Sequence, residues 1–231
     1  MRIARLLIIP LVLLLAPSVF AADKDQAFTT DKRDFKKRFA TIALSPVDAD
    51  PLFNMPDSVA KIVEEEITRR LQKRGYNVLP SSVLAGIRAT MEAQVGGTTN
   101  AETGETDAAR LQAVRSHALR ELWLQHQFDG VATIRISTTT AQFAKGKAEW
   151  DGVTQKVESE GRDKGYGGGI VASSISFAVF DEAMRVQYVY YGGLELLQMR
   201  VEAQLLPVPA DQYFLDEKRI RKAAQIAVSP I

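Results

Sequence analysis

The residues best placed for chemistry are two aspartates, Asp48 and Asp50, which follow a short apolar run. That run, 39–44, suits a pleated strand, and it stops at Ser45-Pro46 because proline cannot donate to a strand ladder. Ligands of open α/β sheets bind at this edge of the strands, where two carboxylates could hold a cation or exchange protons. Turn formation before Pro51 is the commoner role of aspartates in such a position.

Apolar and aromatic side chains supply two further candidate binding surfaces. Phe53 and Met55 lie in the same loop as the aspartates, and they fit either an exposed patch for a partner or packing against the start of the next helix. Tyr188, Tyr190 and Tyr191 could mark an interface, although aromatic residues are also ordinary in strands.

The residues that most enzymes use are scarce in this chain. Its two histidines, His117 and His126, stand nine positions apart on an expected helix, so they point to opposite faces and cannot form a one-face metal pair. Ser116 is next to His117 in sequence and therefore on another side of that helix. With no cysteine, no H-E-x-x-H and no G-x-S-x-G motif, we expect no catalytic residue, no metal and no cofactor.

A glycine-rich stretch, 161–169, has the composition of a phosphate-binding loop but not its pattern. It matches neither G-x-G-x-x-G nor G-x-x-x-x-G-K-[ST], and it comes before an expected strand, whereas a phosphate loop opens a helix. We interpret it as a flexible connection.

The composition limits the class of protein. The 231 residues include 29 basic and 28 acidic ones, and without Arg2 and Arg5 of the leader the count is 27 against 28. A net charge near zero argues against nucleic acid as a partner. The absence of cysteine excludes disulfides and lipid attachment through an N-terminal cysteine, so the chain is not expected to be a lipoprotein.

The first 21 residues have the form of a secretory signal peptide, with two arginines, the apolar run Leu6–Leu15 and the small-x-small end Val19–Ala21. We expect cleavage before Ala22 and a periplasmic protein; an uncleaved anchor is the alternative. A charged tether, 22–38, follows. Its basic cluster fits either contact with anionic lipid headgroups or a solvated leader, and comprises Lys32, Arg33, Lys36, Lys37 and Arg38.

The stretch 39–80 predicts the core of the fold. A strand, a loop and an amphipathic helix capped by Asn54 or Asp57 lead to Gly75, which suits the left-handed position after a helix, and to a strand at 76–79. A helical crossover of this length makes the two strands parallel.

The remaining elements extend that sheet. We expect helices from Ser81 or Ser82 to Ala93 and from Asp107 to His126, and a strand at 131–137. A hairpin about Lys145–Lys147 follows, and then strands at 170–180 and 185–191, with Val171, Ile175, Phe177 and Val179 on one face. The stretch 194–206 fits strand or helix, and Asp211 is expected to cap a last helix that ends near Val228. The sequence therefore predicts one α/β (α+β) domain, 39–231, with a mixed sheet, a parallel β-α-β start, antiparallel hairpins and helices packed on it.

Three short stretches resemble a family of bacterial envelope proteins. They are Ile42–Pro46, the run from Leu71 through Gly75-Tyr76 to Val78-Leu79-Pro80, and Phe128–Ala132. The resemblance is to proteins of the curli-secretion-lipoprotein type, the group that shares an α/β domain with LpoB and with the N-terminal domain of TolB. It implies an accessory role in secretion, transport or cell-wall assembly.

We therefore expect a non-enzymatic periplasmic accessory protein that binds another envelope protein through 48–55 or an exposed sheet edge. One alternative is a hydrolase that uses the carboxylates of that loop. The other is a component of a secretion channel, which the lack of an apolar face in 142–160 disfavours. The sequence leaves homo-oligomerisation open.

Overall fold

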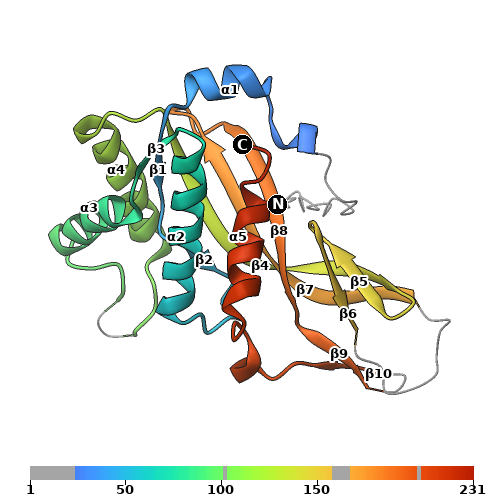
Figure 1. Cartoon of the computed structure of the whole chain (residues 1–231). Coiled ribbons are helices and arrows are strands. Elements are labelled where there is room, and N and C mark those ends of the chain that lie inside the picture. The colour runs from blue at the N-terminus through green and yellow to red at the C-terminus, as the bar shows by residue number, and fades with distance from the viewer. Residues whose placement is uncertain (1–23, 101–102, 158–166, 202–203) are drawn as a thin grey trace, which may run out of the picture.

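The computed structural model describes residues 24–100, 103–157, 167–201 and 204–231 (Figure 1). The expected signal peptide, Ala22 and the stretch 161–166 lie outside the described residues. Among the helices of the described ranges, none combines the length and the apolar character that crossing a bilayer requires.

The parallel part of the sheet is the predicted β-α-β unit. Strand β1 (Thr41–Leu44) lies between β3 (Asn77–Leu79) and β4 (Gly130–Ala144) and runs parallel to both. Helix α2 (Asp57–Lys73) connects β1 to β3, and Gly75 adopts φ +86° after it, as expected.

The start of α2 corrects the expected cap. Pro56 occupies the N-cap position, and no side chain caps the helix there, so neither Asn54 nor Asp57 has that role. Proline has no N–H and fixes φ near the value that a helix start needs, which makes it a compatible neighbour for the first turn. Asp57 lies inside that turn, where its charge favours the helix dipole.

The antiparallel part of the sheet is built on two long strands. β4 pairs with β7 (Gly167–Phe180) from Val131 opposite Phe180 to Ala144 opposite Gly167, so the glycines 167–169 belong to a strand instead of a connection. The remaining strands are β2 (Asp48–Ala49), β5 (Lys147–Trp150), β6 (Val153–Lys156), β8 (Val186–Leu196), β9 (Gln198–Val201) and β10 (Gln204–Pro207). The fold is α+β with a mixed sheet, and the ambiguous stretch 194–206 consists of strands in its described residues.

β7 buries opposite faces at its two ends, and the change occurs near Ser173 and Ser174. Ile175, Phe177 and Val179 face the main core, as expected, but beyond this point Ile170 and Ala172 are buried and Val171 is exposed. Val171 is exposed because this end of the ribbon buries its opposite face: β4 changes in the same way, from buried Ile134 and Ile136 to buried Ala141 and Phe143, although its pairing with β7 has no register shift. A second cluster of apolar side chains packs around Ile170 at this end of the sheet.

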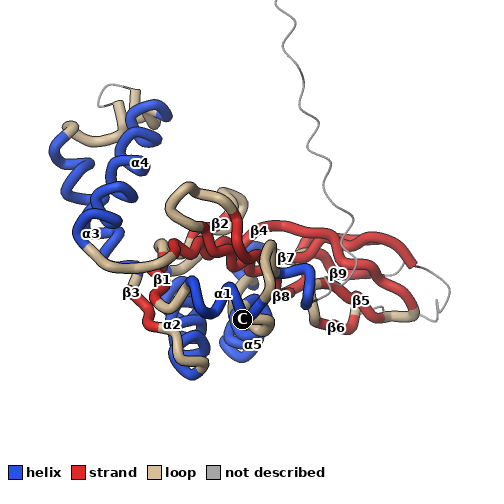
Figure 2. Tube along the Cα trace, turned by 90° about the horizontal axis from the view of Figure 1, so that it is seen from above, coloured by secondary structure: helices blue, strands red, loops and turns tan. Residues whose placement is uncertain are grey.

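Helices cover both faces of the sheet (Figures 1 and 2). Helix α2 and helix α5 (Glu217–Ala227) pack side by side over the main core, while α3 (Ser81–Gln94) and α4 (Ala108–Gln125) form a hairpin on the other face of β1. α5 lies so close to β8 that a Cβ on Gly192 would overlap the carbonyl oxygen of Ala223.

The expected tether is wrong for the residues that the structure describes. Residues Lys24–Ala27 form a 3-10 turn, η1, and Lys32–Arg38 form helix α1, whose Phe35 has no exposed surface. The Phe35 ring stacks on Phe39 with 4.7 Å between centroids and meets Phe28 edge-on at 5.2 Å. These aromatic contacts fix the segment to the domain, so the domain begins before residue 39.

The last helix also begins later than predicted. Asp216, not Asp211, caps α5 by accepting hydrogen bonds from the backbone N–H groups of Lys218 and Arg219. Asp211 lies in a separate 3-10 turn, η2 (Ala210–Gln212). Phe214 lies between η2 and α5 and has φ +62°, which interrupts any continuous helix from 211 onward.

Candidate functional site

The two predicted aspartates meet an arginine that sequence reasoning missed. β2 runs parallel to β4, so Asp48 lies opposite Arg135, whose guanidinium is 2.8 Å from a carboxylate oxygen of Asp48 and 2.6 Å from one of Asp50. Asp50 also accepts a hydrogen bond of 3.0 Å from the backbone N–H of Thr138. The alternation of Ile134, Arg135 and Ile136 gave the signal for an outward-facing cation, but not for its partners.

This pairing determines what the carboxylates can do. Partial burial opposes ionisation of Asp50, yet its hydrogen bonds from Arg135 and Thr138 hold the pKa of that carboxyl below its usual value. A general acid or base near neutral pH needs a raised pKa instead. The pair therefore pins the loop to the sheet and is poorly suited to acid–base work.

Among the apolar side chains of the loop, Phe53 and Met55 pack against the core and Leu52 is exposed. Phe53 is buried, with its ring 5.5 Å from Phe214 and 6.0 Å from Tyr213, and Met55 is half-buried against the main core. Of the two alternatives for Phe53 and Met55, the structure supports packing against the core and not an exposed patch. Phe53 points into the core, and the exposed side chain is that of the preceding residue, Leu52.

An exposed leucine also lies on the other side of the Phe53–Phe214 contact. Leu52 and Leu215 are each 74% exposed, and each directly neighbours one of the two packed rings. The two exposed leucines therefore flank one buried contact in the sequence, and we call this pair the leucine corner. The segments that carry the two leucines lead into α2 and α5, whose first turns lie at the lower end of both helices in Figure 1.

The three tyrosines do not form a surface. Tyr188 has no exposed area, and its hydroxyl donates a 2.8 Å hydrogen bond to the carbonyl oxygen of Ala227. Tyr190 is buried as well, and Tyr191 alone of the three is exposed. The interface prediction is therefore wrong for Tyr188 and Tyr190, which pack β8 against the helices.

The basic cluster of 32–38 is partly used within the protein. Lys32 donates to the carbonyl oxygen of Pro230, and Arg38 forms a 3.2 Å ion pair with the buried Asp181. Lys37 pairs with Asp34 at 3.7 Å on the same helix. All five basic side chains are nevertheless exposed, so lipid contact through the cluster stays a prediction.

A cavity of about 590 Å³ lies beside the aspartates, between the sheet and the α3–α4 hairpin. Arg88, Arg115 and Arg135 line it together with Asp48, so its charge is suited to anions. Ser116 also lines it, but the neighbouring His117 is exposed on α4 and is absent from the lining. His126 ends α4, and nowhere in the described ranges do three or more acidic or imidazole groups gather to hold a metal.

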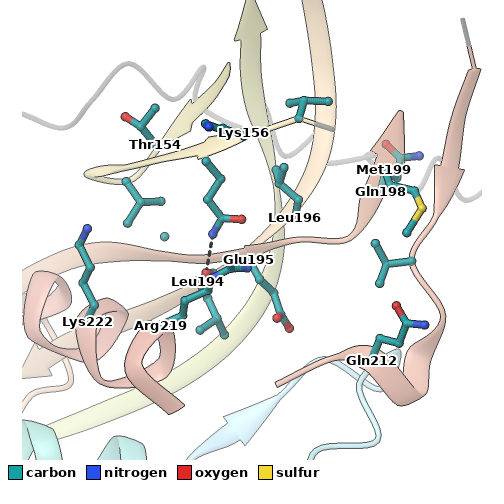
Figure 3. A pocket seen from close by; sticks show the side chains of 15 residues that line it. Thr154, Lys156, Leu194, Glu195, Leu196, Gln198, Met199, Gln212, Arg219 and Lys222 are labelled. Atoms are coloured by element: carbon teal, nitrogen blue, oxygen red, sulfur yellow. Dashed lines mark hydrogen bonds between the residues drawn. The ribbon is translucent and has the colours of Figure 1, made fainter. Parts of the chain in front are cut away.

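A second cavity, of about 560 Å³, is a groove between β6 and β8 (Figure 3). β6 pairs with β5 and β8 pairs with β7, and in the described part of the chain no ladder joins β6 to β8. The side chain of Gln155 crosses the gap and donates a 2.9 Å hydrogen bond to the carbonyl oxygen of Leu194. The groove therefore has a strand edge on each side.

One buried acid supports the floor of the groove. Glu195 accepts a 3.0 Å hydrogen bond from the backbone N–H of Phe214, the residue with positive φ. Burial raises the pKa of the Glu195 carboxyl, and the hydrogen bond from Phe214 only partly offsets that effect. Glu195 thus joins the groove to the leucine corner, and no sequence pattern marked it.

Comparison with known proteins gives little further information. No family model matches the chain, and no curated protein matches it. Among solved structures, a protein from Helicobacter pylori described as a homologue of a neuraminyllactose-binding hemagglutinin is 12% identical, with a TM-score of 0.29 over 87% of this chain and 84% of that chain. A similarity at this level carries no argument about fold or function.

Proposed function

We propose that this chain is a non-enzymatic accessory protein of the bacterial cell envelope that acts by binding another envelope protein. The observation that carries the proposal is the leucine corner. Leu52 and Leu215 expose most of their surface to solvent, while the buried contact of Phe53 with Phe214 holds their backbone in place. Contiguous exposed apolar side chains mark a surface that a partner covers, and the leucine corner is our candidate for such a surface.

Two other features support a non-enzymatic role in the cell envelope. Arg135 occupies the carboxylates that a hydrolase of this loop would need to keep free. The expected secretory leader and the resemblance of Ile42–Pro46 and Phe128–Ala132 to envelope proteins support the proposed compartment.

Site-specific photo-crosslinking in living bacterial cells tests this function. A photoreactive amino acid is placed at position 52 or 215, and Leu124, which is 72% exposed on α4, serves as the matched control leucine. We expect a discrete crosslinked product from positions 52 and 215 and none from position 124, in an osmotic-shock or envelope fraction.

Comparison with position 124 also shows which results would contradict the proposed function. Equal labelling at all three positions would reveal random collision, and an absence of products at both 52 and 215 would remove the observation on which the proposal rests. A chain that stays in the cytoplasm of its natural host would refute the assigned compartment.

A further inference from the structure

The cavity of about 590 Å³ lies at the carboxyl end of β1, the edge at which open α/β sheets bind ligands. Ser45 and Pro46, which directly follow β1, are among its lining residues. Val131, Thr133 and Arg135 also line it, because alternate residues of β4 point to the same face of the sheet. One side of the cavity is therefore regular sheet.

The α3–α4 hairpin supplies the opposite side. Leu84 and Arg88 are four residues apart on α3, and Arg115 and Leu119 are four residues apart on α4, so each pair lies on one face of its helix. Each helix thus presents one apolar and one cationic side chain to the cavity. Met184, which is 46% exposed in the turn between β7 and β8, is a further apolar lining residue.

The three arginines of the cavity differ in how far the protein itself pairs them. Arg135 is held by Asp48 at 2.8 Å. Arg88 has a long contact of 3.5 Å with Glu92, and its Nε is buried without an acceptor among the described residues. Arg115 forms no ion pair in the same part of the chain. The guanidinium groups of Arg88 and Arg115 are therefore the cations that an anionic ligand can use.

The arrangement of donors favours one kind of anion. Guanidinium groups bind carboxylate and phosphate because their N–H groups match pairs of oxygen atoms. Here Arg88 and Arg115 come from separate helices, and the hydroxyls of Ser116 and Thr133 add donors from α4 and β4. A phosphate monoester has three terminal oxygens and can accept from several sides, whereas a carboxylate has two oxygens in one plane.

We propose that the cavity between β4 and the α3–α4 hairpin binds a small phosphate monoester with an apolar substituent. Arg88 and Arg115 bind the phosphate. The apolar side chains of Leu84, Leu119 and Met184 contact the substituent. The cavity volume falls within the range of about 300–1,000 Å³ that is usual for small-molecule sites. This site adds a ligand to the proposed protein-binding role and does not depend on it, since the leucine corner is not part of the cavity.

Isothermal titration calorimetry of the purified mature chain with hexyl phosphate tests the proposal. Inorganic phosphate and hexanol each offer one half of that probe, the anion or the apolar chain. We expect hexyl phosphate to bind at least about tenfold tighter than either, because only this probe uses both the arginines and the apolar lining. Hexanoate, in which a carboxylate replaces the phosphate, should also bind more weakly than hexyl phosphate.

Two variants of α4 supply the matched comparison. Arg115→Gln should weaken binding of hexyl phosphate at least about tenfold, because it removes a charged donor. Arg120→Gln makes the same change of net charge at an exposed position of α4 outside the cavity and should leave the affinity within about twofold.

A third variant tests the cavity itself. Ser116 is exposed on α4 and lines the cavity, so the larger side chain of Ser116→Trp would occupy the space for the ligand without disturbing the core. We expect this variant to lose binding of hexyl phosphate while its circular dichroism spectrum stays that of the natural protein.

A phosphate monoester can be a soluble compound or the headgroup of a lipid, and cosedimentation with vesicles separates the two sources. The vesicles contain phosphatidylcholine and phosphatidate. Cosedimentation that is lost in Arg115→Gln but kept in Arg120→Gln would identify a lipid headgroup as the ligand. Binding of hexyl phosphate without such cosedimentation would identify a soluble compound.

Several results would overturn the proposed phosphate site. They are the absence of binding by hexyl phosphate, equal affinity for inorganic phosphate or hexanol, and an equal loss of affinity in Arg115→Gln and Arg120→Gln. Equal or tighter binding of hexanoate would overturn the choice of phosphate. Crosslinking from positions 52 and 215 is a separate measurement, so failure of the phosphate site leaves the proposed function standing, and the reverse also holds.

Discussion

Replacing Gly192 with alanine should break the close packing of β8 against α5. A Cβ at this position would overlap the carbonyl oxygen of Ala223 and stand 2.8 Å from its carbonyl carbon and 3.0 Å from the nitrogen of Ala227. Ordinary contacts between carbon atoms are about 3.5–4.0 Å long, so α5 must retreat by roughly 1 Å. The obstacle is helix backbone, which cannot rotate away as a side chain can.

The magnitude follows from what that retreat disrupts. The hydroxyl of Tyr188 bonds to the carbonyl of Ala227 at 2.8 Å, and an added 1 Å would break this buried hydrogen bond. A buried polar group left unpaired costs about 1–3 kcal/mol, and overpacking a core costs a further 1–3 kcal/mol or so. We expect the free energy of unfolding to fall by about 4 kcal/mol and the Tm by about 12 °C, at roughly 3 °C per kcal/mol for a chain of this size.

Urea unfolding of the mature chain measures this loss, with Gly168→Ala as the control. Gly168 also lies in a strand, but a Cβ there would meet only Phe143 at an ordinary 3.5 Å. Tyr188→Phe adds a second check, because it removes the same hydrogen bond without a clash. If the retreat of α5 already breaks that bond, Tyr188→Phe should cost little in the Gly192→Ala background. A loss for Gly192→Ala no greater than for Gly168→Ala would refute the reasoning.

Three further stability predictions can be measured by denaturant unfolding across pH. Burial raises the pKa of Glu195 in the folded protein. The contribution of Glu195 to stability is therefore present below the pKa of an ordinary glutamate and is lost as pH rises through the higher folded pKa. Glu195→Gln should be more stable than the natural protein at about pH 7 but not at about pH 4. Glu66 is the opposite case: burial opposes its ionisation, but Arg69 and Arg70 hold its pKa below the usual value, so Glu66→Gln should lose about 1–3 kcal/mol at neutral pH and less as the pH falls through the folded pKa. Gly86→Ala in α3, where a Cβ has no atom within 4 Å, should gain about 0.5–1 kcal/mol at all pH values, and a loss would contradict the open surroundings.

The parts of the fold that the sequence predicts are those with local causes. The β-α-β unit was predictable because Val59, Val63 and Ile67 recur at helical spacing and Gly75 ends the helix, all within one continuous stretch. The hairpin at Lys145-Gly146 also has a local cause, since both residues adopt positive φ between two strands that are adjacent in the sequence.

The errors have non-local causes. Phe35 lies among charged residues, and it is buried because Tyr188, from a distant part of the chain, packs against it together with the nearby Phe28 and Phe39. The change of buried face along β7 depends on Ala148 and Trp150 of β5, which pack with Ile170 and Ala172, so the sequence of β7 alone cannot reveal it.

The candidate site illustrates the same limit. The sequence located the loop that holds Asp48 and Asp50, but Arg135 joins them through a strand pairing across more than eighty positions. The groove between β6 and β8 was foreseen only as an unspecified sheet edge. Its two sides come from separate hairpins, and their relative position depends on the whole sheet.

The long pairing of β4 with β7 has a mechanical consequence. One uninterrupted two-stranded ribbon carries the β1 region under α2 and α5 at one end and the β5–β6 hairpin at the other. With no linker between the two ends in the described residues, the hairpin end has no hinge about which to swing as a separate body. A force applied to the hairpin end would therefore travel as tension and shear along the ribbon into the helix-covered half.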